Sequence, residues 1–175
     1  PDDDLVVDAA SLESFFDLFR RHRLALAQPA LDETSHWSHE VTLAHPGFLL
    51  RHTNFVEVMA PAFSRDALRA CAATFAATRT GWGIDLVWSR ILGDPRETIA
   101  VVDATPMVHT RPVGSSYALD DSFREMEALA ARWGVSLPFR FAQYGGVVPA
   151  GGGASRPVRS GLAFFARLVL GAPRS

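Results

Sequence analysis

Apolar and polar residues alternate along the chain with two periods, one typical of helices and one typical of strands. Apolar side chains three or four residues apart indicate an amphipathic helix, and short runs of β-branched and aromatic residues indicate a strand. The helical period predicts helices over residues 11–23, 64–78, 84–92 and 115–133. Asp8 or Ser11 is the expected N-cap of the first helix, and Ser64 that of the second. The other pattern predicts strands over residues 24–28 and 98–102, ended by Pro29 and Asp103, and one bent or two separate strands within 48–63. Strands and helices follow one another, so we expect a mixed α/β fold.

The segments without such periods divide the chain. Residues 31–46 form a polar, His-bearing stretch that predicts a loop, and the Gly-Gly and Gly-Gly-Gly runs after Gly145 predict a linker. Residues 158–170 have the pattern of a short amphipathic helix, which would be the place of any peripheral membrane contact. We therefore expect a catalytic domain over 1–144 and a linker with an amphipathic tail over 145–175.

Composition narrows the class of protein. A chain of 175 residues that is 48% apolar suits one domain with a packed core. Its net charge of -2 gives no basic field for nucleic acid, and no apolar run approaches the roughly 18 residues that span a bilayer. Cys71 is the only cysteine, so neither an internal disulfide nor a Cys-based zinc site is available. We expect a cytoplasmic protein without a membrane span or nucleic-acid partner. All 17 basic residues are Arg, which excludes lysine Schiff-base chemistry.

Three short motifs carry the candidate chemistry. The chain begins with Asp2, Asp3 and Asp4 against an apolar pair, and two carboxylates in an Asp-x-Asp at a strand end offer the oxygen ligands that Mg²⁺ or Mn²⁺ prefers. The alternative is a solvated turn, since Pro and Asp are common in turns. The missing initiator Met and the abrupt acidic start suggest that residues precede this segment in a larger catalytic unit.

The second motif is Gly81-Trp82-Gly83-Ile84-Asp85, and the third is Met107-Val108-His109. Trp82 offers a flat apolar face for a sugar ring, and Gly83 lets the backbone approach a ligand closely. Asp85 falls in the first turn of a predicted helix, where a carboxylate is favoured and can act as a base. An ordinary helix cap, a core aromatic and a core histidine are the structural alternatives for Asp85, Trp82 and His109.

Glu57 and a set of four histidines each have more than one possible role. Glu57 lies in an apolar extended run, so if buried it either pairs with Arg51 or Arg65 or faces substrate. His36 and His39, with His45 and His52 nearby, could form a zinc site, or one of the first two could touch the sugar or diphosphate. The segment lacks an HExxH motif and has the composition of a loop, which favours loop or core histidines.

Several stretches resemble a known family. Residues 28–32, 54–64 and 81–85, with 101–103 through 108–109, are similar to a family of unknown function whose plant members are labelled lysine-ketoglutarate reductase trans-splicing-related. The resemblance runs from Pro1 to about Gly114 and is most specific within 54–64. The label names no chemistry that these residues support, because no Gly-x-Gly-x-x-Gly follows a strand.

The order of the motifs also resembles, more distantly, the later half of glycosyltransferases of the A-type fold. The resemblance implies a mixed sheet flanked by helices, with Asp2, Asp4 and His109 as ligands of Mn²⁺ or Mg²⁺ and Asp85 as the base. Asp3, Glu57, Trp82 and Gly83 are then the expected substrate-binding residues. Two features differ: the half that normally holds the nucleotide base does not precede Pro1, and the acidic residue follows Ile84 directly instead of lying in a carboxylate pair.

The first hypothesis is therefore a metal-dependent glycosyltransferase-like enzyme. It would move a sugar from a nucleotide-sugar donor to a hydroxyl of a glycan, lipid or small-molecule acceptor. A single base opposite the leaving group implies inversion at the anomeric carbon. The alternatives are a carbohydrate or nucleotide-sugar binding module without turnover and another enzyme on the same scaffold.

Overall fold

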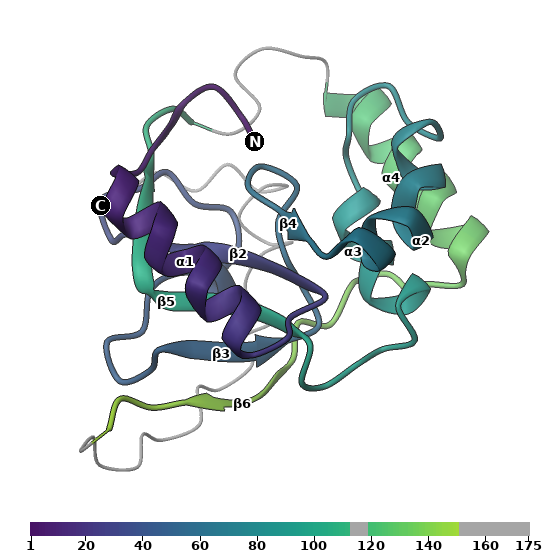
Figure 1. The fold of residues 1–175 in the computed structure, drawn as a ribbon. Helices are drawn as coiled ribbons and strands as arrows, with labels where there is room; N and C mark the ends of the chain where they lie inside the picture. Colours follow the sequence, from purple (N-terminus) through teal and green to yellow (C-terminus); the bar gives the residue numbers. More distant parts are fainter. Residues whose placement is uncertain (113–118, 151–175) are drawn as a thin grey trace.

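A mixed sheet of six strands forms the centre of the computed structural model, which describes residues 1–112 and 119–150 (Figure 1). The strands are β1 (Leu5–Val6), β2 (Leu26–Leu31), β3 (Leu50–Thr53), β4 (Ala62–Phe63), β5 (Ile99–His109) and β6 (Gln143–Val147). Their order is β4-β2-β5-β3-β6, and β1 pairs with the end of β5. The β2–β5 pair is parallel and the other pairs are antiparallel. The predicted α/β class and the mixed sheet flanked by helices are confirmed.

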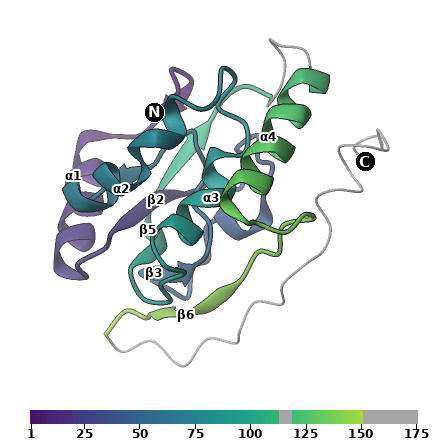
Figure 2. The same cartoon turned by 90° about the vertical axis from the view of Figure 1, so that its right-hand side faces the viewer.

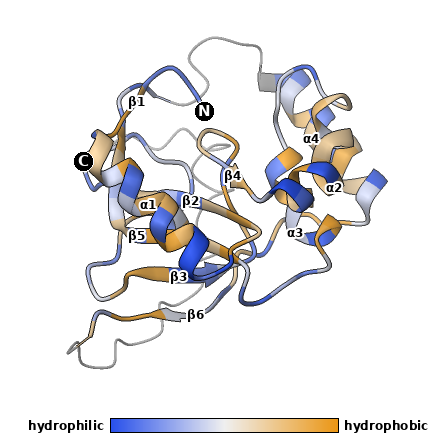
Figure 3. Ribbon diagram, viewed as in Figure 1, coloured by the Kyte–Doolittle hydropathy of each residue, from blue (hydrophilic) through white to orange (hydrophobic). Residues whose placement is uncertain are grey.

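Helices cover the sheet on both faces. They are α1 (Ala9–Arg21), α2 (Arg65–Phe75), α3 (Ile84–Ile91), α4 (Leu119–Trp133) and a 3₁₀ turn, η1 (Glu40–Thr42). Leu26 and Ala27 are neighbours in β2 and therefore point to opposite faces: Leu26 packs in a core with Trp88 of α3, whereas Ala27 packs with Phe15 of α1. Figure 2 shows α4 alongside α3, and Figure 3 shows the alternation of apolar and polar residues along α1. No helix of the described residues is long and apolar enough to cross a membrane.

Helix starts follow the predicted caps. Ser64 precedes α2, and its Oγ accepts a hydrogen bond from the N–H of Ala67 at 3.3 Å. Asp8 caps α1 in the same way and accepts from Ser11 at 2.8 Å. Residues 48–63 contain two strands, β3 and β4, which was one of the two predicted arrangements.

Two strands run past the residues predicted to end them. β2 continues through Pro29 to Leu31. Proline has no backbone N–H to donate, but β4 pairs only with Leu26 and Ala27, so it needs no donor at Pro29. The β2–β5 register also shifts next to Pro29, where the missing N–H is tolerated. β5 continues through Asp103 to His109. The buried carboxylate of Asp103 accepts hydrogen bonds from the Arg51 guanidinium and from the His45 N–H, so the strand does not have to end at this residue.

The linker predicted to begin at Gly145 is wrong for its first residues. Residues 145–147 belong to β6, which pairs with β3. A Cβ at Gly146 would lie 2.4 Å from the Leu50 carbonyl oxygen and 2.7 Å from Phe48, so glycine permits the close approach of these two strands. The predicted tail helix over 158–170 lies outside the described residues.

Candidate active site

Strand pairing brings the acidic start of the chain beside the end of β5. The β1–β5 register places Leu5 opposite His109, so Asp4, which precedes β1, lies next to the imidazole. The Asp4 Oδ2 atom is 3.1 Å from His109 Nε2, and the two side chains are 12% and 6% exposed. Two predicted metal ligands that are 105 positions apart are therefore neighbours in a mostly buried environment.

The orientation of His109 suits a metal ligand. Its Nδ1 lies 2.6 Å from the backbone carbonyl oxygen of His36 and must donate there, since a carbonyl only accepts. This leaves Nε2 directed at Asp4. Imidazoles that bind metals commonly donate their second ring N–H to a carbonyl in this way, and carboxylate oxygens suit Mg²⁺ and Mn²⁺. These two residues thus fit a metal ligand pair.

The third predicted ligand, Asp2, lies in the same region. Its N–H donates to the Met59 carbonyl at 2.8 Å. Burial, and after it the charge of Asp4, raise the pKa of the Asp2 carboxyl. Within residues 1–112 and 119–150, however, no three His, Cys, Asp or Glu side chains are grouped closely enough to hold a metal ion. A metal at this site stays a prediction.

Arg111 is a neighbour that the sequence analysis missed. Its Nη2 is 2.5 Å from Asp3 Oδ1 and its Nε is 3.3 Å from Asp4 Oδ2. Asp3, expected to bind substrate, has a side chain that is 91% exposed and pairs with this arginine. Arg111 lies two residues after His109, the last residue of β5, and this short spacing is the only sequence signal that could have indicated it.

Asp85 is buried at the start of α3. It is 8% exposed, and its two carboxylate oxygens accept hydrogen bonds from the backbone N–H groups of Val58 at 3.2 Å and Leu86 at 3.0 Å. Burial raises the pKa of Asp85 to about 6, although these hydrogen bonds oppose the shift. An acid with that pKa is ionised at neutral pH and is basic enough to take a proton, as a general base must.

Glu57 is a buried acid that is affected by the charges of both Asp85 and the acidic start of the chain. It is 5% exposed, and burial raises its pKa well above the ordinary value, with the charges of Asp85 and then Asp2 adding to the shift. Arg51 does not neutralise Glu57, because its guanidinium is bound to Asp103. The predicted pairing of Glu57 with Arg51 is therefore wrong, and no ion pair joins Glu57 to Arg65 in the described part of the chain.

The turn before α3 is supported by α4. Gly83 has φ +86°, and a Cβ there would lie 2.8 Å from the Cα of Met126, so this glycine is required by the close approach of α4. The sequence predicted that a ligand lies close to the Gly83 backbone, whereas in the structure helix α4 lies there. Trp82 is half-buried and contacts the edge of Phe123 at 5.4 Å between ring centroids. Its role as an acceptor platform stays a prediction.

His36 and His39, the candidates for a zinc site, have separate contacts in the structure. His39 packs against Phe55 and Phe141, and burial lowers its pKa to about 3, so the ring is neutral. His36 contributes its backbone carbonyl to His109. Because the grouping required for a metal is not found in the described part of the chain, nothing favours a zinc site here over loop and core histidines.

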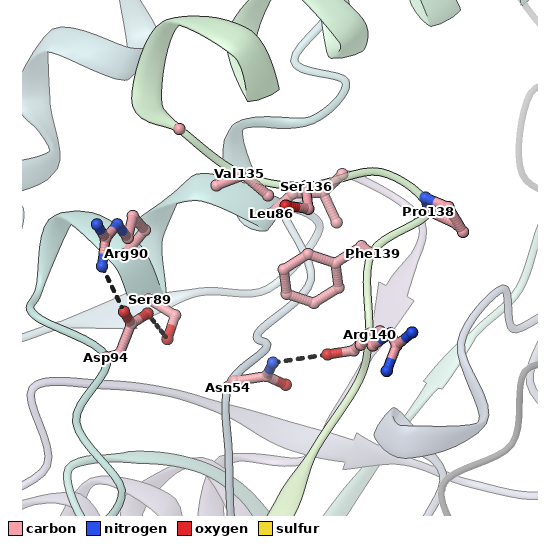
Figure 4. A pocket seen from close by; sticks show the side chains of 11 residues that line it. Asn54, Leu86, Ser89, Arg90, Asp94, Val135, Ser136, Pro138, Phe139 and Arg140 are labelled. Atoms are coloured by element: carbon pink, nitrogen blue, oxygen red, sulfur yellow. Dashed lines mark hydrogen bonds and ion pairs between the residues drawn. The ribbon is translucent and has the colours of Figure 1, made fainter.

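A separate pocket lies beside α3 (Figure 4). Its volume is about 300 Å³, and none of the predicted site residues lines it. Leu86, next to Asp85 in sequence, forms part of its wall, and Phe139 projects toward its centre (Figure 4). The Arg90–Asp94 ion pair at 3.0 Å and the Asn54 to Arg140 hydrogen bond at 2.8 Å satisfy much of its polar rim.

A family of proteins matches part of the chain. Residues 50–135 match the model of a family described as "Protein of unknown function (DUF707)". This supports a domain of an unknown-function family over the segment that holds Glu57, Trp82, Asp85 and His109. No curated protein and no solved structure matches the chain.

Proposed function

We propose that this protein is a metal-dependent glycosyltransferase with the later half of an A-type fold. The match to a family of unknown function over residues 50–135 names no activity, so the proposal depends on the site. The observation that carries it is the Asp4–His109 pair at 3.1 Å, and a buried Asp85 whose pKa is raised to about 6 supports it. The charges of both Asp85 and Asp2 raise the pKa of Glu57, which supports a single site for the two parts.

Each residue has a distinct task in the proposed reaction. Asp85 accepts the proton of the acceptor hydroxyl as that oxygen forms a bond to the anomeric carbon. The bond from the anomeric carbon to the diphosphate oxygen breaks, and its electron pair leaves with the nucleoside diphosphate. Attack opposite the leaving group inverts the anomeric centre.

Asp4 and His109, with Asp2 beside them, would hold Mn²⁺ or Mg²⁺. When bound, such an ion supplies positive charge that stabilises the departing diphosphate. Arg111 adds a fixed cation next to Asp4 and reduces the negative field that the donor diphosphate meets. The donor is thus expected beside Asp4 and His109, and the acceptor at Asp85.

The test begins with a panel of nucleotide sugars in thermal-shift and turnover assays, with and without Mn²⁺. Asp85→Asn is expected to keep Mn²⁺-dependent nucleotide binding and to lower turnover by roughly 10²–10⁴, the usual contribution of a general base. Asp66→Asn is the matched control, because Asp66 is also in the first turn of a helix and its side chain is 94% exposed. Full activity of Asp85→Asn would exclude it as the base. If the wild-type protein neither binds nor uses any nucleotide sugar, the transferase proposal fails.

A further inference from the structure

Glu57 is a buried carboxyl group for which the described residues provide no hydrogen-bond donor. Its Oε2 atom is buried and unpartnered, and its Oε1 is 3.9 Å from His39 Nε2, too far for a hydrogen bond. His39 also brings no positive charge, because its pKa is about 3. Among residues 1–112 and 119–150, the titratable groups that act on Glu57 are Asp85, Asp2 and this neutral imidazole.

The backbone holds this carboxyl group in place despite its environment. The Glu57 N–H donates to the buried Gln28 side chain at 2.6 Å, and the next residue, Val58, donates to Asp85 at 3.2 Å. The segment is therefore fixed to β2 on one side and to α3 on the other. A buried polar group without a partner costs free energy, so a fold that holds one rigidly suggests that a ligand completes it.

We infer that Glu57 accepts a hydrogen bond from a second hydroxyl of the acceptor, adjacent to the hydroxyl that Asp85 deprotonates, so that the acceptor is a sugar or another vicinal diol. This inference rests on the proposed function. The second carboxyl group is supplied by the segment between β3 and β4, which the Val58 N–H joins to Asp85.

The charges of the site exclude other occupants. Phosphate or carboxylate groups beside Glu57 and Asp85 would meet two acidic groups with which no arginine of the described residues forms an ion pair, since Arg51 is bound to Asp103 and Arg111 to Asp3 and Asp4. A simple alcohol would supply one donor and leave Glu57 unpartnered. A vicinal diol supplies two donors to two carboxyl groups.

The experiment measures binding and stability separately from turnover. Saturation-transfer NMR is recorded with methyl pyranosides of glucose, galactose and mannose, and with the monodeoxy analogue of each that binds. Glu57→Gln is expected to weaken binding about 10-fold or more. It should also unfold at the same temperature as the ligand-free wild type, or at a higher one, because it removes a buried acid. Glu40→Gln, an exposed change in η1, is the matched control and should alter neither quantity.

Each outcome decides the inference. Wild-type protein that binds none of the glycosides, or a Glu57→Gln variant that binds them equally well, would overturn it. A ligand-free Glu57→Gln protein that unfolds several degrees lower would overturn it as well, by showing a structural role. Glycoside binding that depends on Glu57 without use of any nucleotide sugar would support the subsite and refute the transferase. Transfer to acceptors with a single hydroxyl, unchanged in Glu57→Gln, would support the transferase and refute the subsite.

Discussion

Replacing Asp85 by Asn is expected to stabilise the protein increasingly as the pH rises. In the folded chain the pKa of Asp85 is about 6, against an ordinary value of 3.8. Between these values the folded state binds more protons than the unfolded state, so the wild type loses stability as pH rises through this window. The shift of about 2 pKa units corresponds to about 3 kcal/mol at about 1.36 kcal/mol per unit.

The Asn variant does not carry this penalty but loses one well-oriented acceptor for the N–H groups of Val58 and Leu86. That loss is worth about 1 to 3 kcal/mol and does not vary with pH. The informative quantity is therefore the change of the stability difference with pH. We expect the variant to gain up to about 3 kcal/mol relative to wild type between pH 4 and pH 8.

Denaturant unfolding at pH 4, 5, 6, 7 and 8, followed by tryptophan fluorescence, measures this difference. Trp88 is fully buried in the core that contains α3 and is a suitable probe. A second series in the Glu57→Gln background separates the titration of Asp85 from that of its neighbour. A difference that stays constant over the whole pH range would refute the burial argument for Asp85.

Three further changes test other contacts. Asp4→Asn should weaken Mn²⁺-dependent nucleotide binding by about 10-fold or more, measured by calorimetry with and without Mn²⁺, and unchanged binding would remove Asp4 from the ligand set. Gly83→Ala should lower stability by about 2 to 4 kcal/mol in denaturant unfolding, because the left-handed backbone and the 2.8 Å approach to Met126 both disfavour a Cβ, and a wild-type midpoint would contradict this packing. Arg51→Met should cost about 3 to 5 kcal/mol by leaving the Asp103 carboxylate buried and unpaired. Adding Asp103→Leu should recover much of that loss, and no recovery would show that the two residues do not act as a pair.

Local signals predicted the helices and most of the strands. The caps at Asp8 and Ser64 and the spacing of apolar residues are properties of short segments, and they give the observed starts of α1 and α2. The predictions were wrong where a distant partner decides the outcome. Pro29 remains in β2 because the pairing with β4 ends at Ala27, before the proline. Gly146 belongs to β6 because only glycine fits so close to Phe48 and Leu50.

The sequence by itself determined which chemical groups are available: an acidic start, an acid after a Gly-Trp-Gly turn, a late histidine and an isolated Glu57. Only the tertiary structure decided which of them meet. The β1–β5 register brings Asp4 to His109, and Glu57 is buried between β2 and α3, where residues 1–112 and 119–150 place no cation beside it. Pairing register and burial depend on contacts between residues far apart in the chain, and a single sequence specifies these only through the complete fold.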